Sequence, residues 1–153
     1  MRGLLAASIP IEPARPGELP EILALLEECG LPPDGLGDHL SSTLVARWKG
    51  RVVGSAALEL YERTALLRSI AVRRDLRGAG LGGRLTAVTL NLALELGVEE
   101  AYLLTETASS FFPRFGFRRI PRSKVPEDVR RSVEFVSACP AGARAMALTL
   151  RAG

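Results

Sequence analysis

Alternating and helical patterns of apolar residues divide the first third of the chain into a strand, a helix and a loop. Ile9 and Ile11 alternate with polar or small neighbours, which predicts a first strand over residues 8–14. The prolines at the start of the next segment predict a helix that ends near Cys29, with Gly30 as its stop. Residues 31–40 are punctuated by proline and glycine, so they predict a loop with room for one short helix.

The middle of the chain has the pattern of a β-meander followed by a crossover helix. Residues 43–48 and 51–60 are apolar runs on either side of a Lys-Gly pair, which predicts a hairpin. A turn at 62–64 leads into the aliphatic run 66–72, which has the length of a buried central strand. Apolar residues then recur at helical spacing up to Gly97. Residues 101–105 predict a fifth strand, parallel to the central one through this crossover.

The last third is divided into shorter elements. Residues 108–115 predict a short helix, 117–120 a short strand, 126–138 a helix opened by Pro126, and 143–150 a last strand. A chain of 153 residues with 47% hydrophobic residues has the size and composition of one globular domain. We therefore expect residues 1–153 to form a single domain.

Composition narrows the function classes. No run of about 18 apolar residues is present, so we expect no membrane partner. The N-terminus lacks a charged-then-apolar signal pattern, which predicts a cytoplasmic protein. The net charge of +3 comes without a lysine-rich tract or a base-stacking aromatic set, so we expect no nucleic acid. Cys29 and Cys139 lie far apart and the chain has 1 histidine, so we expect no metal site.

A glycine-rich segment between the central strand and the long helix carries the candidate chemistry. Unpaired N–H groups and the dipole at a helix start suit a phosphate, and glycine lets it approach the backbone. Two patterns compete for these glycines. Gly78, Gly80 and Gly83 spell GxGxxG, the dinucleotide fingerprint of an NAD(P)-binding oxidoreductase, and Glu106 lies at a suitable distance for a ribose. Arg77, Gly80 and Gly82 spell R-x-x-G-x-G.

The second pattern resembles the acetyl-coenzyme A loop of the GNAT N-acetyltransferases. Its context supports this resemblance, because a basic five-residue bridge separates the strand from the first glycine, whereas the dinucleotide motif begins at the strand end. The later segment AYLLTETASSFFPRFGF, with its terminal Gly-Phe, is similar to the second motif of the family. Together with VPEDVRRSVEFVSACP, it resembles the small acetyltransferases associated with arsenic resistance. The central motifs are also similar to amino-acid N-acetyltransferases of the glutamate type.

The resemblance implies an α/β fold with a mixed, seven-stranded, twisted sheet and helices on both faces. It implies acetyl-CoA as cosubstrate and a small-molecule amine as acceptor, an amino acid or a glutamate mimic, in a monomer or homodimer. Strand backbone is implied to hold the pantetheine arm at Ser69, Ile70, Ala71 and Val72, with Phe112 nearby. The pyrophosphate is implied to bind the N–H groups of Arg77, Gly78, Ala79, Gly80, Leu81, Gly82 and Gly83. Further positive charge is expected from Arg73, Arg74 and Arg84.

The family chemistry needs a base, an oxyanion site and an acid. Glu59 and Glu106 are the acids expected to line the cleft, either as the base or as ordinary strand-end glutamates. A backbone N–H near Ile70 is expected to stabilise the oxyanion. Phe112 takes the place of the tyrosine that protonates the coenzyme thiolate in many members, and phenylalanine donates no proton. Water or Thr105 is then left as the acid, and an inert coenzyme-binding sensor stays an alternative.

Arg68 stands on the central strand just before the residues assigned to the pantetheine arm. An unpaired buried guanidinium is costly, so the position needs a partner. One reading makes Arg68 the anchor for an acidic group of the acceptor, because its planar fork suits a carboxylate. The other reading is an ion pair with Glu59 on the neighbouring strand.

Overall fold

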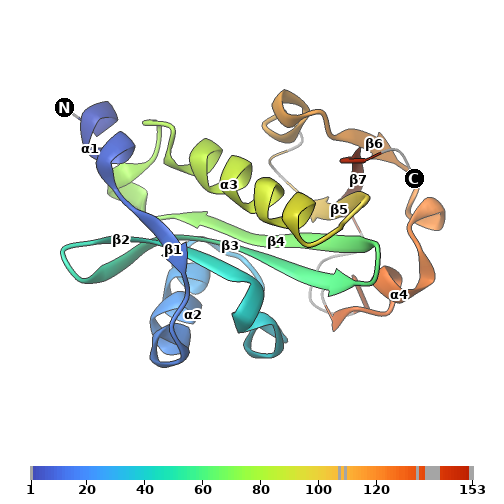
Figure 1. The fold of residues 1–153 in the computed structure, drawn as a ribbon, viewed down its shortest axis with the longest axis horizontal. Coiled ribbons are helices and arrows are strands. Elements are labelled where there is room, and N and C mark those ends of the chain that lie inside the picture. The colour runs from blue at the N-terminus through green and yellow to red at the C-terminus, as the bar shows by residue number, and fades with distance from the viewer. Residues whose placement is uncertain (1, 107, 109, 134, 137–141, 152–153) are drawn as a thin grey trace.

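Seven strands form one mixed sheet in the order β1-β2-β3-β4-β5-β7-β6 (Figure 1). The computed structural model describes residues 2–106, 108, 110–133, 135–136 and 142–151. The strands are β1 (Ile11–Pro13), β2 (Thr43–Trp48), β3 (Arg51–Tyr61), β4 (Thr64–Val72), β5 (Glu100–Thr105), β6 (Arg118–Ile120) and β7 (Arg144–Thr149). The α-helices are α1 (Arg2–Ser8), α2 (Leu19–Glu28), α3 (Leu81–Glu95) and α4 (Glu127–Arg130). Short 3-10 turns are η1 (Pro16–Glu18), η2 (Leu36–Ser42), η3 (Arg74–Leu76), η4 (Phe112–Phe115) and η5 (Arg122–Lys124).

The predicted meander and parallel crossover are confirmed. β2 and β3 form an antiparallel hairpin whose turn residues Lys49 and Gly50 have φ of 52° and 74°. Positive φ at both central residues matches a tight turn to the twist of its strands. β4 continues antiparallel to β3, and β5 lies parallel to β4 after the passage through α3. Strands 43–48 and 101–105 agree with the sequence prediction to within one residue at each end.

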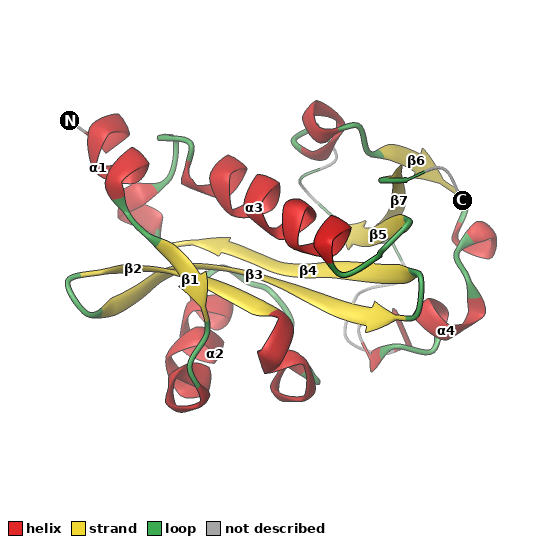
Figure 2. Ribbon diagram, viewed as in Figure 1, coloured by secondary structure: helices red, strands yellow, loops and turns green. Residues whose placement is uncertain are grey.

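Helices cover both faces of the sheet, as Figure 2 shows. On one face, α3 and α1 pack together over the sheet through Leu81, Leu85, Ala6 and Ile9. On the other face, α2 buries Ile22, Leu25 and Leu26 against β2 and β3. The predicted α/β fold with a seven-stranded mixed sheet is therefore confirmed. None of the helices within the described residues has the length and apolarity needed to cross a bilayer.

The N-terminus differs from its prediction. The expected strand over residues 8–14 is shortened to β1, and residues 2–8 form α1 instead. Leucine and alanine dominate this segment and are among the strongest helix formers, while Pro10 separates the helix from the strand. The alternation of Ile9 and Ile11 therefore belongs to a helix–strand junction.

Two predicted helices in the last third are also corrected. Within the described part of 126–138, α4 is followed by a turn at residues 131–132, after which residue 133 is helical again and residues 135–136 lie in a π-helical turn. Ser132 Oγ accepts the N–H of Phe135, as a capping serine does at the start of a helix, so the predicted helix is interrupted near Ser132. Residues 134 and 137–138 of this prediction lie outside the described part of the chain. The helix expected over 108–115 is the single turn η4, where Pro113 limits its extension, and residue 109 is likewise outside.

Candidate active site

β4 and β5 separate in the middle of the sheet. Their parallel pairing covers only Thr64–Leu66 against Glu100–Tyr102, although both strands continue beyond it. The diverging ends flank a cavity of about 720 Å³, which the loop 29–34 after α2 also lines. Strands that have parted no longer satisfy each other's N–H and C=O groups, so the walls of this cavity suit a ligand that bonds to backbone.

A β-bulge shapes the β4 wall. Ser69 and Ile70 together stand opposite one β3 residue, at a register shift between Ser55 and Ala57. Ser69 has φ of 60°, a left-handed conformation that is uncommon for a non-glycine residue. Its carbonyl accepts a 2.7 Å hydrogen bond from Ser55 Oγ. Residues 69–72, predicted to hold the pantetheine arm, all line the cavity.

The glycine-rich segment leads into the N-terminus of α3. Gly78 and Gly80 have φ of 79° and 92°, which glycine adopts without a Cβ penalty, and Gly80 is the N-cap. The first N–H groups of a helix have no partner within the helix, so they are donors for an anion. They border a second cavity of about 470 Å³, lined by residues that include Arg77, Gly78, Gly80, Leu81, Gly82 and Gly83.

The two cavities adjoin. Val72 and Arg77 line both of them, so the strand backbone and the helix start face one extended site. Arg77 Nε donates to the carbonyl of Val72 at 3.0 Å, and Nη2 lies 3.2 Å from Cys29 Sγ. Ala79, which the sequence placed with the phosphate donors, packs against the core cluster beneath α1.

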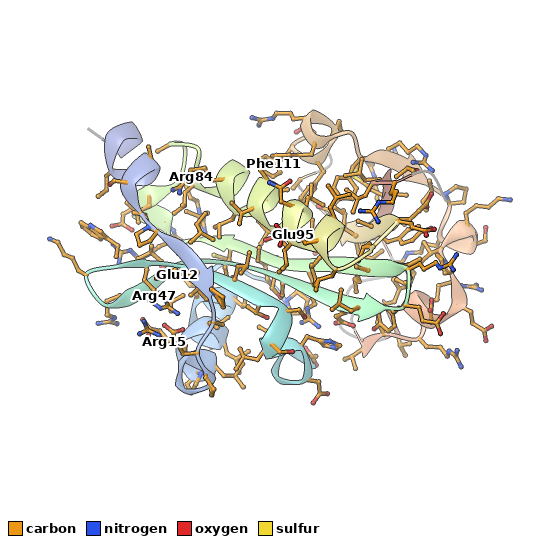
Figure 3. The ribbon with its side chains drawn as sticks, viewed as in Figure 1. Glu12, Arg15, Arg47, Arg84, Glu95 and Phe111 are labelled. Atoms are coloured by element: carbon orange, nitrogen blue, oxygen red, sulfur yellow. The ribbon has the colours of Figure 1, made fainter. Side chains whose placement is uncertain are left out.

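Two arginines expected to surround the phosphates are engaged elsewhere. Arg84 donates to the main-chain carbonyls of Ala6 and Ile9 and so attaches α1 to α3; its label lies beside both helices in Figure 3. Arg73 forms a bidentate pair with Asp75, at 2.7 and 3.0 Å. This hydrogen bonding raises the pKa of the Arg73 guanidinium. Arg77 is thus the predicted cation that lines the glycine cradle.

The sequence interpretation missed part of the second cavity. Phe111, Arg114 and Phe115 also line it, opposite the glycines. The Arg114 guanidinium lies 5.1 Å from the centroid of the Phe111 ring, and the two phenylalanine rings are 5.3 Å apart. Aromatic faces beside a cation suit a nucleotide base and its phosphates. The signal in the sequence was the run FFPRF, whose aromatic and basic residues are those of this wall.

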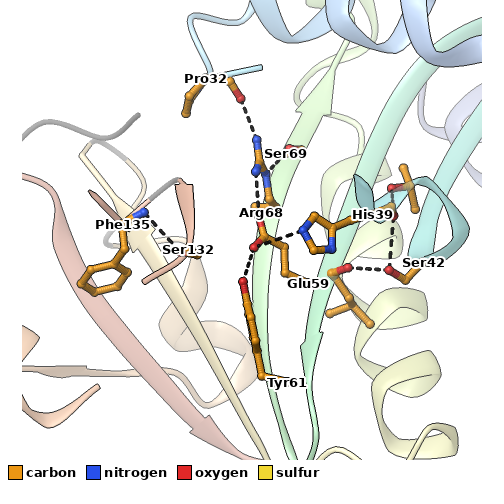
Figure 4. A network of polar contacts seen from close by, with 11 residues as sticks. Pro32, His39, Ser42, Glu59, Tyr61, Arg68, Ser69, Ser132 and Phe135 are labelled. Atoms are coloured by element: carbon orange, nitrogen blue, oxygen red, sulfur yellow. Dashed lines mark hydrogen bonds and ion pairs between the residues drawn. The ribbon is translucent and has the colours of Figure 1, made fainter. Parts of the chain in front are cut away.

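Arg68 and Glu59 form a buried ion pair behind the cavity wall (Figure 4). Arg68 Nη1 donates to Glu59 Oε2 at 2.7 Å, and their side chains are 0% and 2% exposed. The ion pair expected as the alternative role of Arg68 is thus the arrangement present. Although residue 68 borders the cavity, its side chain has no solvent-accessible surface from which to meet an acceptor.

Glu59 was expected to line the cleft, but its side chain is buried. Tyr61 donates its hydroxyl to Glu59 Oε1 at 2.5 Å, and His39 Nε2 lies 3.4 Å from the same oxygen. Burial and this hydrogen bond raise the pKa of the Tyr61 phenol above its usual range. Glu59 is not among the described residues that line the cavity. A buried carboxylate whose oxygens already accept from Arg68 and Tyr61 is poorly placed to take a proton from an acceptor amine.

Glu106, Thr105 and Phe112 meet at the β5 side of the cavity. Glu106 is exposed, directly after the strand, so its carboxylate is open to the cavity and to solvent. Thr105 is 9% exposed, and its Oγ1 accepts the N–H of Ala108 at 3.0 Å. The Phe112 ring packs edge-on against Phe117 at 5.8 Å, so it belongs partly to the core.

Within the described residues, no group of three or more histidine, cysteine, aspartate or glutamate side chains is arranged to hold a metal ion. The described ligand set of this site is instead backbone N–H groups, arginine and two exposed carboxylates, Glu106 and Asp34, of which the sequence interpretation had not included Asp34. These groups suit an anionic, elongated organic ligand.

Comparison with known proteins identifies the family. The sequence model of the acetyltransferase (GNAT) domain matches residues 39–119, which is more than half of the chain. An uncharacterized N-acetyltransferase of Chlorobaculum tepidum is 34% identical over 95 residues, which is 61% of this chain and 61% of that protein. The chain therefore belongs to the GNAT family of acetyltransferases, whose cosubstrate is acetyl-CoA.

Solved structures share the fold. N-acetylglutamate synthase from Neisseria gonorrhoeae, complexed with coenzyme A and N-acetyl-glutamate, superposes with a TM-score of 0.80 at 24% identity. That match covers 94% of this chain and 35% of the synthase. A Mycobacterium tuberculosis protein in complex with CoA gives 0.77 at 25% identity, over 92% of this chain and 98% of that one. This chain thus spans about a third of the synthase and 61% of the curated relative.

Family membership decides between the two glycine patterns. The expected GNAT N-acetyltransferase with acetyl-CoA as cosubstrate is confirmed at the level of the family. The NAD(P)-dependent alternative rested on the same glycines, so it loses its support. The acceptor and the roles of individual site residues stay predictions.

Proposed function

We propose that this domain transfers the acetyl group of acetyl-CoA to the amino group of a small amino acid or glutamate mimic. The observation that carries the proposal is the continuity of the two cavities through Val72 and Arg77. A diphosphate at the start of α3 directs a pantetheine arm along residues 69–72, which brings the thioester between β4 and β5. The acceptor then enters between the loop 29–34 and Glu106. The neighbouring synthase complex, which holds N-acetyl-glutamate, supports an amino acid as acceptor.

Glu106 is the proposed general base. An amino group is mostly protonated near neutral pH, so one proton must leave before its nitrogen attacks the thioester carbon. Glu106 lines the cavity and is exposed, so it takes this proton directly or through one water. The carbonyl oxygen gains negative charge as the C–N bond forms, and the N–H groups of the bulge at Ser69 and Ile70 are the proposed donors.

The carbon–sulfur bond then breaks and the coenzyme leaves as a thiolate. Phe112 has no proton to give, and the Thr105 hydroxyl is the nearby side chain that has one. A thiol has a pKa of roughly 8.5, so a thiolate leaves tolerably well near neutral pH even if water supplies the proton. We therefore assign Thr105 a supporting role and expect the proton transfer to sulfur not to limit turnover.

The direct anchoring of an acidic group by Arg68 requires a rearrangement. The Arg68 side chain is 0% exposed and paired with Glu59, so a carboxylate reaches it only if the cavity wall opens. The other expectations stay predictions: one domain over residues 1–153, a monomer or homodimer, and a cytoplasmic location.

The test is a thiol-release assay. The protein is mixed with acetyl-CoA and a panel of amino acids and simple amines, and the release of coenzyme thiol is followed with mass detection of the products. We expect release that depends on an amino acid, with one acetyl group added to its amine. Coenzyme binding without acetylation of any amine would favour the inert sensor. Failure to bind the coenzyme at all would overturn both readings.

A further inference from the structure

A fully buried ion pair sits behind the cavity, where an apolar pair would serve stability as well. The Arg68 and Glu59 side chains are 0% and 2% exposed. Removing two charges from water is costly, and replacing such a pair by packed apolar residues is often neutral or stabilising. The positions that the pair imposes on its neighbours are therefore a better indication of its role than its contribution to stability.

Within the described residues, the guanidinium of Arg68 contacts β3, the loop at Pro32 and the neighbouring Ser69 on its own strand (Figure 4). Nη1 is held by Glu59 on β3, at 2.7 Å. Nη2 donates to the main-chain carbonyl of Pro32 at 3.1 Å, in the loop that lines the cavity opposite β4. Nε donates to Ser69 Oγ at 3.1 Å, on the bulge. Because a guanidinium is planar and rigid, its three nitrogens keep fixed positions relative to one another, so the three contacts are coupled.

The bulge held by Arg68 needs external support. Ser69 has φ of 60°, a conformation that persists only where the surroundings determine it. Arg68 binds its side chain and Ser55 binds its carbonyl. The wall loop is flanked by Gly30 and Gly35, whose φ values are 70° and 77°, so its ends adopt conformations that favour glycine.

We infer that Arg68 is a positioning residue, which sets the distance between the wall loop at Pro32 and the bulge at Ser69, with Glu59 as its support. The width of the acceptor half of the cavity then depends on a group that never contacts the substrate. The catalytic consequence rests on the proposed acetyl transfer, whereas the structural coupling does not.

Arg68→Lys tests the inference. Lysine keeps a positive charge for Glu59, so the variant is expected to fold, but one ammonium cannot maintain all three contacts in the same geometry. We expect the amide hydrogens of Leu31, of residues 34–36 and of residues 69–71 to exchange with solvent faster. With L-glutamate as the acceptor probe, or whichever amino acid the wild type acetylates best, KM should rise roughly tenfold. The Kd for coenzyme A should stay within about twofold.

A double variant, Glu59→Leu/Arg68→Met, removes both charges of the pair together. Its matched control is Glu18→Leu/Arg47→Met, which replaces another ion pair of low exposure, 2.6 Å long and distant from the cavity lining. We expect faster exchange at Leu31 and residues 34–36 in the first double variant and not in the second. Ser69→Ala, which removes only the Nε contact, should accelerate exchange at the bulge alone.

If Arg68→Lys folds and its amide hydrogens exchange at the wild-type rate in both segments, the inference is overturned. It is also overturned if the control double variant changes KM by the same factor. If Arg68→Lys and the double variant do not fold, unchanged exchange at the bulge of Ser69→Ala overturns it. If the wild type acetylates no amine, the proposed function fails, while the exchange measurements still decide the coupling.

Discussion

A side chain is unfavourable at Gly80 and at Gly82 for different reasons. Gly80 has φ of 92°, so any substitution there strains the backbone whatever the space around it. Gly82 lies in the first turn of α3, and a Cβ added to it would meet Val72 and Phe111 at ordinary contact distances of 3.7 and 4.0 Å. Both neighbours line the second cavity, so a methyl group at position 82 would enter the space proposed for the phosphates.

Gly82→Ala is therefore expected to separate coenzyme binding from folding. The methyl group should raise the Kd for coenzyme A about tenfold, or roughly 1.4 kcal/mol. Alanine favours a helix over glycine, so the melting temperature should stay the same or rise. Isothermal titration and thermal melts measure the two effects. Gly17→Ala is the control, because its added Cβ meets nothing within 4 Å and lies outside both cavities. Wild-type affinity in Gly82→Ala would remove the phosphate-cradle assignment.

Glu106→Gln should lower kcat/KM at pH 7 by about 100-fold or more, because general-base catalysis is worth at least that factor. The loss should shrink as the pH rises, since a growing fraction of the acceptor amine is then already unprotonated. A pH–rate profile of both proteins measures this convergence. Glu100→Gln at the start of β5 is the control, because Glu100 binds Tyr102 and Thr149 and does not line the cavity. A constant ratio of the two rates at every pH would contradict the assignment of Glu106 as the base.

Substitution of two arginines near the start of α3 should have opposite effects on coenzyme affinity and on melting temperature. Arg77 lines both cavities, so Arg77→Met should raise the Kd for coenzyme A several-fold, by about 1 kcal/mol. Arg84 binds the carbonyls of Ala6 and Ile9, so Arg84→Met should lower the melting temperature and leave the Kd unchanged. Paired titrations and melts test this. The reverse pattern would restore Arg84 as a phosphate ligand.

At the level of elements, edge strand β1 is joined to the sheet by a charged cluster as well as by its pairing with β2. Arg47 on β2 donates to Glu18 of η1 at 2.6 and 2.8 Å, and to Glu12 of β1 at 2.7 Å. Figure 3 shows the Arg47 and Glu12 labels side by side. The hydrogen bond from Arg47 is the main cause that lowers the pKa of Glu18 from 4.5 to about 2.

This cluster makes stability depend on pH in the acid range. A carboxyl group whose pKa is lowered by folding stabilises the fold above its unfolded pKa, and this contribution is lost as pH falls through the folded value. For Glu18 the loss lies between about pH 4.5 and 2 and amounts to roughly 3 kcal/mol at most. Glu18→Gln should therefore be less stable than the wild type at pH 6 and lose less stability down to pH 2.5.

Urea denaturation across this pH range measures the difference. Glu12→Gln is the matched control, because Glu12 binds the same arginine but its side chain is 51% exposed. An exposed ion pair contributes about 1 kcal/mol or less, so the control should follow the wild type closely. Parallel stability curves for Glu18→Gln and the wild type would contradict the role given to Glu18.

At the level of the whole molecule, the site links the meander to the C-terminal third of the sheet. β4 belongs to the N-terminal meander, β5 pairs with β7, and the second cavity is bounded by both α3 and η4. A ligand in the two cavities therefore contacts elements from most of the chain. Binding only to the folded state stabilises it by mass action.

Coenzyme A at about 100 times its Kd should raise the stability by roughly 2.7 kcal/mol. For a chain of 153 residues this corresponds to a melting temperature about 5 to 10 °C higher. NAD at the same concentration should give no shift, because the glycines are assigned to acetyl-CoA. Differential scanning calorimetry measures both. A shift with NAD that equals the shift with coenzyme A would reopen the dinucleotide interpretation.

The sequence by itself determined the order of the elements from Thr43 to Thr105 and the position of the glycine-rich start of the long helix. These features depend on local rules: apolar periodicity within each segment, positive φ at turn glycines, and unpaired N–H groups at a helix start. The N-terminal helix was missed, and so was the break near Ser132 in the helix predicted over 126–138, because competing local preferences there differ little. In such segments a single proline or serine determines where a helix begins or ends, and the spacing of the apolar residues does not indicate this position.

Only the tertiary structure decided which charged groups reach the cavity. Glu59 and Glu106 both stand near strand ends in the sequence, yet one is 2% exposed behind the wall and the other is open to the cavity. Arg68 and Arg84 are bound to Glu59 and to the carbonyls of α1, respectively. Such pairings depend on strand register, on the bulge at Ser69 and on how α1 packs. These bring together residues that lie far apart in the chain, and no local pattern records them.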